Sequence, residues 1–429
     1  MIKATKLLWI VVQLLVFEIA LFGQQSPARV IDLNNLIDAA VTNNPAIKGG
    51  QLNVEITNND IQIKKAELLP QISANATYGL SDENSLRNNY SFFRSGINVS
   101  QNLWKKGKYN SLVRQSKFIY QAKQSEFEAQ KLDLILQVKF SYYNLLRYRK
   151  LYEISENNIF QAELYLDAAK EKNKLGVGKY SDILKAESDL ADAKFLAKNY
   201  SYSLKESEIE LSRLTGLPVI AESIPQNTIL VGSNRLNVLE RDSLLELAKI
   251  SYPELQVIEN IGLSQEYLIS ATKADLFPAV TANTGYSWLY NPVFSGQPTW
   301  YAGVAISWDV FDGKRRKNQV KTEMLRSQSY QYQKEDLLLE LVKEIENILN
   351  AFNEVKNQIE ISEILMKSTV ENLKMLEEEY KQGISSMLEL TIARTDDFNA
   401  NAKHINAITD YELVKAQLER IIGVTSLNN

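Results

Sequence analysis

Cysteine is absent from the 429-residue chain, and histidine occurs once, at His404. The lack of cysteine excludes disulfides, thiolate metal sites, a cysteine nucleophile and lipidation of an N-terminal cysteine. A single histidine argues strongly against a histidine metal cluster or a histidine-based triad. No glycine-rich phosphate loop or convincing pair of catalytic carboxylates stands out either. We therefore expect no catalytic residues, no metal and no cofactor.

Glycine and proline are scarce, at 17 and 9 residues, where average usage would give roughly 30 and 20. Few turns imply long elements, whereas an enzyme of this size normally has many loops to hold its site. The chain has 48 basic and 52 acidic residues, so it lacks the basic excess that suits nucleic acid. Composition thus argues against an enzyme and against a nucleic-acid partner.

The first residues have the pattern of an export signal. Lys3 and Lys6 precede an apolar run over residues 7–22, after which the chain turns polar. This pattern predicts a secretory signal peptide over residues 1–25, cleaved within residues 22–28. A retained membrane anchor is the alternative, but Glu18 and the short run argue against it. No later stretch has 18 consecutive apolar residues, so any membrane crossing by the mature chain would need β-strands.

Two stretches, residues 108–175 and 314–382, contain neither glycine nor proline. They are rich in strong helix formers, and apolar residues recur at steps of three and four, as at Leu338, Val342 and Ile345. That spacing is typical of a coiled-coil seam. A helix of this length would measure about 100 Å, which favours an elongated molecule over helices broken inside a globule.

Each long run ends in a short glycine turn, at residues 176–178 and 383–386. A second run without glycine or proline follows each turn. Glycine just past a helix is a common C-terminal stop. Ser181 is predicted to cap the first returning helix, with Asp182 in its first turn. We therefore predict two antiparallel helical hairpins, at about residues 105–216 and 314–422.

The chain contains an internal duplication of about 200 residues. Pro45 matches Pro253 at a spacing of 253 − 45 = 208, and Gly176 matches Gly383 at 383 − 176 = 207. The one-residue change falls between Tyr78 and Gly96, which marks an insertion or deletion in a loop. We predict a first repeat over residues 26–216, a linker over 217–243 that forms a belt around the middle, and a second repeat over 244–429.

Each repeat also contains a segment in which apolar residues alternate with polar ones, at about 71–104 and 279–311. Each segment predicts two strands of membrane-crossing length, with aromatic residues near the strand ends as in an interfacial girdle. The alternative, a pair of soluble hairpins packed on a core, remains open on alternation alone. The predicted girdle consists of Tyr90, Trp104, Tyr290, Trp300, Trp308 and Phe311.

Four strands cannot close a barrel, and open edges in lipid would leave backbone groups unpaired at several kcal/mol each. The chain must therefore assemble. Two copies would give eight strands, whose interior is filled by side chains, and three would give twelve, wide enough for a pore. The strand count thus favours a homotrimer in which the helices form a tube coaxial with the barrel.

The chain resembles the TolC-like outer membrane efflux proteins in the order of its elements. In each repeat that order is helix, proline, strand pair, glycine-lysine, long helix, glycine turn and return helix. The local matches are Leu68–Ile72, Leu103–Lys108, Val310–Arg315, Val177–Leu184 and Leu214–Leu217. The resemblance covers nearly the whole mature chain. It implies a mostly α-helical fold with a membrane β-barrel, in which a homotrimer forms a 12-stranded barrel in the outer membrane on an α-helical periplasmic tunnel.

The resemblance further implies the exit duct of a tripartite efflux or type I secretion system. Its partners would be a periplasmic adaptor protein, an inner membrane pump and outer membrane lipid. We expect the adaptor to contact the hairpin turns at Gly176, Gly178, Lys179, Ser181, Gly383, Ser385 and Ser386. Many relatives carry an acylated N-terminal cysteine, which this chain lacks.

A periplasmic gate is expected at Asp182, Tyr380, Glu389 and Ile392. Asp182 and Tyr380 match the acidic and tyrosine positions of the family's constriction, but Ser385 and Ile392 replace an expected arginine and aspartate. The gate should therefore be looser, or built around an apolar constriction at Ile392. Alternatively, Asp182 and Glu389 only stabilise helix N-termini, at about 0.3–1 kcal/mol each.

Two other features have ordinary explanations. His404 is expected on a solvated helix surface, and the basic cluster at residues 314–317 is expected to contact lipid headgroups. Two rival classes remain: a periplasmic coiled-coil adaptor or scaffold without a barrel, and a secreted structural fibre. The duplicated, aromatic-rich strand pairs argue against the adaptor.

Overall fold

The computed structural model describes residues 32–83, 88–225, 240–290, 296 and 298–423. The predicted signal peptide, residues 1–25, lies outside the described residues, as does most of the predicted linker. Within the described residues, no helix combines the length and the apolar character needed to cross a membrane.

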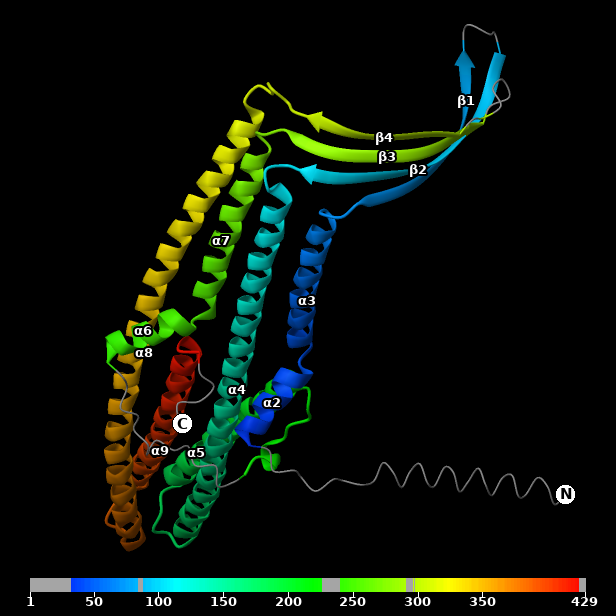
Figure 1. Cartoon of the computed structure of the whole chain (residues 1–429). Coiled ribbons are helices and arrows are strands. Elements are labelled where there is room, and N and C mark those ends of the chain that lie inside the picture. The colour runs from blue at the N-terminus through cyan, green and yellow to red at the C-terminus, as the bar shows by residue number, and fades with distance from the viewer. Residues whose placement is uncertain (1–31, 84–87, 226–239, 291–295, 297, 424–429) are drawn as a thin grey trace, which may run out of the picture. The chain divides into compact units, whose positions relative to one another are not determined.

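The helices confirm the duplication, because each helix of the first repeat has a counterpart in the second (Figure 1). The shorter pairs begin 208 residues apart and the longer pairs 207 apart, as the sequence predicts. The first repeat contains α2 (Leu33–Asn43), α3 (Pro45–Ala66), α4 (Lys108–Lys174) and α5 (Tyr180–Thr215). The second contains α6 (Arg241–Ser251), α7 (Pro253–Ala274), α8 (Arg315–Gln382) and α9 (Met387–Ile421). A single 3₁₀ turn, Ala221–Ser223, follows α5.

The four strands form one antiparallel sheet in chain order, as Figure 1 shows. They are β1 (Gln71–Glu83), β2 (Asn88–Trp104), β3 (Ala279–Tyr290) and β4 (Pro298–Ser307). Tyr286 of β3 lies opposite both Ile97 of β2 and Trp300 of β4. The two repeats therefore join through the pairing of β2 with β3, and β1 and β4 form the two edges.

The register places residues of different character on the two faces of the sheet, because successive side chains point to opposite sides. One face carries most of the large apolar side chains: Ile72, Tyr78, Phe93, Ile97, Val280, Tyr286, Trp288, Trp300, Val304 and Ile306. The other is mainly polar, with Asn75, Thr77, Asn98, Asn283, Ser287 and Thr299. Polar side chains bond across strands on that second face, as Asn98 does with Asn75 at 3.0 Å.

β4 ends earlier than the alternation suggests. Its last residue is Ser307, so Trp308 and Phe311 follow the strand and the prediction that they lie within it is wrong. The guanidinium of Arg316 donates to the backbone carbonyl of Asp309. It also binds the Asp312 carboxylate, with 2.6 Å between Nε and Oδ2. These contacts fix the chain after Ser307 as a turn leading into α8.

The described residues divide into two units. Unit 1 consists of residues up to 44, 134–238 and 349–418; unit 2 consists of residues 45–133, 239–348 and 419–429. In unit 1, Leu36 and Ala40 of α2 are fully buried, and Asn44 Nδ2 donates to the carbonyl of Leu214 at 3.0 Å. In unit 2, the Arg420 guanidinium bridges Asp133 and Glu254.

The predicted apolar stripe of α8 is largely confirmed. Its predicted residues Ile345, Phe352, Val355 and Ile359 are buried, whereas Leu338, Val342 and Leu349 are half-buried. Leu341 and Ile348 are buried as well, which keeps the spacing of three and four residues. α8 therefore presents one continuous apolar stripe and leaves its opposite side to charged residues.

Candidate functional site

The glycines that open the two hairpin turns have the same backbone φ. Gly176 and Gly383 adopt φ values of +76° and +77°, which favour glycine because a Cβ would clash there. After Gly176, the N–H groups of Val177 and Gly178 bond back to the Lys172 carbonyl at 3.1 and 3.0 Å. Such bonds satisfy carbonyls left open at a helix end. The two turns thus end α4 and α8 by the same device.

The turns expose apolar side chains. Val177 is 78% exposed, and its equivalent Ile384 (177 + 207 = 384) is 70% exposed. Of the predicted contact residues, Gly176, Lys179, Ser181, Gly383 and Ser386 are exposed, whereas Gly178 and Ser385 are half-buried. The hairpin turns therefore present apolar groups surrounded by small and polar residues.

The helices that leave the turns begin differently. α5 begins at Tyr180, and its N-cap Lys179 makes no side-chain cap, so the predicted cap at Ser181 is wrong. α9 has a reciprocal cap in which the Ser386 N–H and hydroxyl donate to the Glu389 carboxylate at 2.7 and 2.8 Å. Those hydrogen bonds, the backbone one first, lower the pKa of Glu389. Glu389 therefore acts as a capping residue.

Tyr380 is a core residue of unit 1. It packs in a buried cluster with Leu166 of α4, Ala186 of α5 and Leu390 of α9. The Lys172 ammonium lies 3.5 Å from the centre of its ring and donates to its backbone carbonyl at 2.9 Å. Burial, and then the nearby Asp182 carboxylate, raise the pKa of Tyr380.

The four predicted gate residues thus have different surroundings. Asp182 is half-buried close to Tyr380, and within the described chain its carboxylate has no hydrogen bond or ion pair. Glu389 is exposed and bound to Ser386. Ile392 is 51% exposed on α9. Only Asp182 and Tyr380 are brought together.

A buried polar cluster, which sequence reasoning missed, joins the two hairpins within unit 1. Asp189 of α5 and Arg394 of α9 are only 6% and 7% exposed. The Thr391 hydroxyl donates to Asp189 Oδ2 at 2.9 Å, and Arg394 Nη2 lies 3.9 Å from the same oxygen. Charges this deeply buried are costly unless they compensate each other.

The polar cluster continues to α4 and α8. The Arg394 guanidinium lies 5.7 Å from the centre of the Tyr165 ring, and the Tyr165 hydroxyl donates to the Glu377 carboxylate. Burial raises the pKa of the Tyr165 hydroxyl and lowers that of Arg394. The Nε atom of Arg394 has no hydrogen-bond partner among the described residues. All four long helices therefore contribute to one polar cluster.

His404 is less solvated than the sequence predicts. It is half-buried on α9, and its Nδ1 lies 3.1 Å from the hydroxyl of the buried Ser362 on α8. Burial lowers the pKa of His404. Among the described residues, no group of three or more acidic or histidine side chains could hold a metal ion.

The predicted aromatic girdle is largely exposed. Tyr290, Trp300, Trp308 and Phe311 are 45% exposed or more, as is Trp104 at the end of β2. The side chain of Tyr90 lies outside the described residues. Uncovered aromatic and aliphatic side chains on one face of a sheet are unfavourable in water, so this face needs an apolar surrounding.

The chain belongs to the outer membrane efflux protein family, whose model matches residues 36–217 and 244–424, one copy in each repeat. It is an outer membrane efflux channel with a periplasmic helical part, and not an enzyme. The alternative of an adaptor or scaffold without membrane strands is therefore wrong.

Individual relatives are distant in sequence. The chain is 21% identical over 381 residues to the probable efflux pump outer membrane protein TtgC of Pseudomonas putida, covering 86% of this chain and 78% of that one. It is 22% identical over 409 residues to the outer membrane protein TolC of Vibrio cholerae, covering 92% and 91%. The solved CmeC outer membrane channel of Campylobacter jejuni superposes with a TM-score of 0.78 at 19% identity, covering 91% and 85%.

Proposed function

We propose that three copies of this chain form the exit duct of a tripartite efflux or type I secretion system. The observation that carries the proposal is the sheet, whose edges β1 and β4 lack strand partners within the described chain. Unpaired strand edges in lipid cost several kcal/mol per group, so the sheet must close with other copies. Three copies of four strands give twelve, enough for an open lumen.

The character of the two faces of the sheet indicates which face points outward when the sheet closes into a barrel. With the face of Tyr286 and Trp300 outward, the aromatic and aliphatic side chains meet lipid. The face of Asn98 and Asn283 then lines the lumen, where polar side chains can meet water. The opposite closure would leave polar groups in hydrocarbon without partners.

The partners follow from this assembly. The efflux-pump relatives match over most of their length, which supports an inner membrane pump and a periplasmic adaptor as partners of this chain. The exposed Val177 and Ile384 at the two hairpin turns support adaptor docking there. Exposed apolar groups at a helical tip suit a protein partner.

The adaptor contact is tested by crosslinking in cells. A photoactivated crosslinker at Lys179 or Ser386 should capture the adaptor. The control position is Asn88, which begins β2 at the opposite end of that strand from α4. Capture from Asn88 and not from the turns would invert the topology and contradict the docking proposal.

We infer that Asp182 and Ile392 contribute to the closed end of the duct. The Asp182 carboxylate is available because it forms no hydrogen bond or ion pair with the described residues, whereas Glu389 is already bound to Ser386. Three Asp182 carboxylates around a narrow opening would attract cations. Ile392, 51% exposed on α9, would supply an apolar ring.

The assembly itself is tested by membrane fractionation. We expect the protein in the outer membrane as a complex that migrates as a trimer on unheated denaturing gels and as a monomer after boiling. A dimer, or release of the protein by a soluble wash, would contradict the proposed duct.

A further inference from the structure

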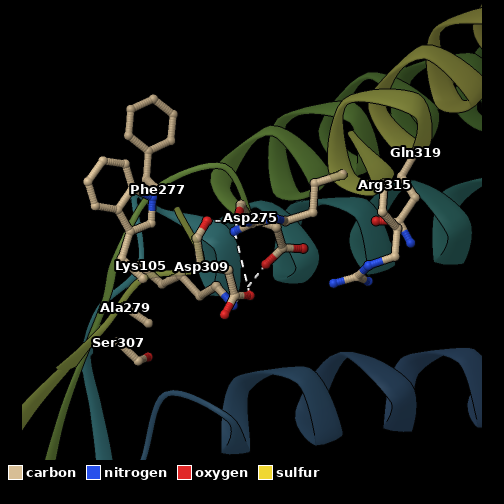
Figure 2. A pocket seen from close by; sticks show the side chains of 10 residues that line it. Lys105, Asp275, Phe277, Ala279, Ser307, Asp309, Arg315 and Gln319 are labelled. Atoms are coloured by element: carbon tan, nitrogen blue, oxygen red, sulfur yellow. Dashed lines mark hydrogen bonds and ion pairs between the residues drawn. The ribbon is translucent and has the colours of Figure 1, made fainter. Parts of the chain in front are cut away.

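A polar pocket lies in unit 2 where the sheet meets the helices. Its volume is about 330 Å³, near the lower end of the range for small-ligand sites. Figure 2 shows Phe277, Ala279 and Ser307 on the strand side, and Arg315 and Gln319 on the side of α8. Lys105, which follows β2, also lines the pocket.

The charges that line the pocket leave a positive excess. Lys105, Arg315 and Arg316 face the two carboxylates of Asp275 and Asp309, which leaves one unbalanced positive charge. Asp275 is neutralised by Lys105 and also by Lys108, which lies outside the pocket; both ammonium groups lie 2.8 Å from its Oδ1. Burial alone would raise the pKa of Asp275, but hydrogen bonds from the two lysines lower it.

The two arginines that line the pocket differ in their contacts. Arg316 is buried and holds the pocket wall, since it binds Asp312 and donates to the carbonyl of Asp275 at 2.8 Å. Arg315 is exposed, and within the described residues its guanidinium forms no hydrogen bond or ion pair. A guanidinium with free donors is well shaped for two oxygens of a phosphate. Arg315 is therefore the group in the pocket that remains available to an anion.

The surroundings indicate where the anion comes from. The exposed rings of Trp308 and Phe277 also line the pocket, so an anion bound there would lie beside apolar groups. Aromatic and basic side chains occur together at the level of lipid headgroups. A soluble phosphate would gain nothing from the rings, whereas a phospholipid would place its glycerol and first methylenes against them.

We propose that this pocket binds the phosphate of a phospholipid headgroup in the periplasmic leaflet of the outer membrane. Arg315 donates to the phosphate oxygens, and Trp308 contacts the glycerol region. The proposal rests on the proposed function, which places the sheet in the membrane and the helices in the periplasm. It assigns one phospholipid to each chain.

The test is native mass spectrometry of the intact assembly in a nonionic detergent. The probes are phosphatidylglycerol, a diacylglycerol with the same chains, and inorganic phosphate. We expect phosphatidylglycerol to saturate at one tight site per chain, and diacylglycerol to bind at least tenfold more weakly. The variant Arg315→Gln should weaken phosphatidylglycerol binding on the order of tenfold, as for a lost charged hydrogen bond.

The matched control is Lys321→Gln, which removes an exposed cation from the same helix outside the pocket. Equal effects of the two variants, or equal binding of diacylglycerol, would overturn the proposal. Displacement of the lipid by inorganic phosphate at similar concentration would show a soluble-anion site and would also overturn it. Channel currents in planar bilayers are measured on the same samples. If the wild-type protein conducts normally but binds no phosphatidylglycerol at this site, only the lipid inference is refuted. If the wild-type protein carries no current, the proposed duct itself is refuted.

Discussion

At the scale of single residues, His404 couples the packing of α8 and α9 to pH. Because burial lowers its pKa, the imidazole in the folded protein is neutral at a pH where the unfolded chain is already protonated. The unfolded state then binds more protons, so stability falls as the pH drops below about 6.5, the ordinary value of the group. Above that pH, His404 contributes no pH dependence.

We predict an NMR pKa for His404 below 6.5 in the assembled protein. The signal needs no assignment because the chain has a single histidine. The variant His404→Gln should flatten the dependence of thermal stability on pH in the mildly acidic range. A measured pKa at or above 6.5 would contradict the buried contact with Ser362.

The two acidic residues near the turns are predicted to act differently. Asp182→Asn should reduce the cation selectivity of the closed channel, because its carboxylate has no other partner among the described residues. Glu389→Gln should loosen the start of α9, since the Glu389 carboxylate accepts both hydrogen bonds from Ser386. Reversal potentials in a salt gradient measure the first effect, and hydrogen exchange of α9 measures the second.

The control for both is Glu187→Gln, an exposed carboxylate on α5. If the reversal potential is unchanged in the double variant Asp182→Asn with Glu389→Gln, these carboxylates do not line the opening. Their roles would then be limited to helix termini, at about 0.3–1 kcal/mol each.

At the scale of helices, the buried polar cluster holds the two hairpins in one arrangement. Asp189 and Arg394 come from different hairpins and lie 3.9 Å apart in a buried position, where Asp189 also pairs with Lys185 of its own helix at 2.5 Å. Removing one member of a buried pair typically costs about 3–5 kcal/mol, whereas replacing both by apolar residues of similar size is often tolerated. The cluster therefore makes the separation of α5 from α9 costly.

We predict that Asp189→Asn destabilises the hairpin ends of unit 1 by about 3–5 kcal/mol and increases proteolysis of α5 and α9. Asp192→Asn, an exposed change on the same helix, is the control and should have little effect. The double variant Asp189→Leu with Arg394→Met should recover most of the stability. Equal protease resistance of the Asp189→Asn variant and the wild type would contradict a structural role for the pair.

The helices follow closely from the sequence, but the polar cluster does not. The ends of α4 and α8 are marked by Gly176 and Gly383, whose local conformation depends on few other residues. The cluster uses positions that are not equivalent between repeats. The counterpart of Arg394 is Glu187 (394 − 207 = 187), and that of Glu377 is Lys170 (377 − 207 = 170). Only the packing of the two hairpins shows that these residues meet.

The end of β4 and the start of α5 were also mispredicted, for related reasons. Alternation continues past Ser307, but long-range bonds from Arg316 end the strand there. Ser181 is a good capping residue by type, yet the bonds from Val177 and Gly178 to Lys172 set the turn, and α5 begins at Tyr180. Local patterns locate an element, while tertiary contacts decide its last residues.

At the scale of the whole molecule, the account depends on which face of the sheet meets water. The duplication supplies two strand pairs, and their pairing through β2 and β3 builds one sheet with an apolar and a polar face. A duct requires the polar face to line the lumen. Adjacent residues of one strand lie at nearly the same depth in the membrane and point to opposite faces of the sheet. Two such residues therefore differ mainly in the face that they report.

The most direct measurement uses Ala282→Cys and Asn283→Cys, neighbours on β3 that point to the apolar and polar faces. The native chain has no cysteine, so each variant carries one reactive thiol per chain. A charged, water-soluble thiol reagent is added during current recording in planar bilayers. The account predicts that the reagent reduces the current through Asn283→Cys channels and leaves Ala282→Cys channels unchanged. Block of the Ala282→Cys channels with no effect on Asn283→Cys, or no effect on either, would contradict a lumen lined by the polar face.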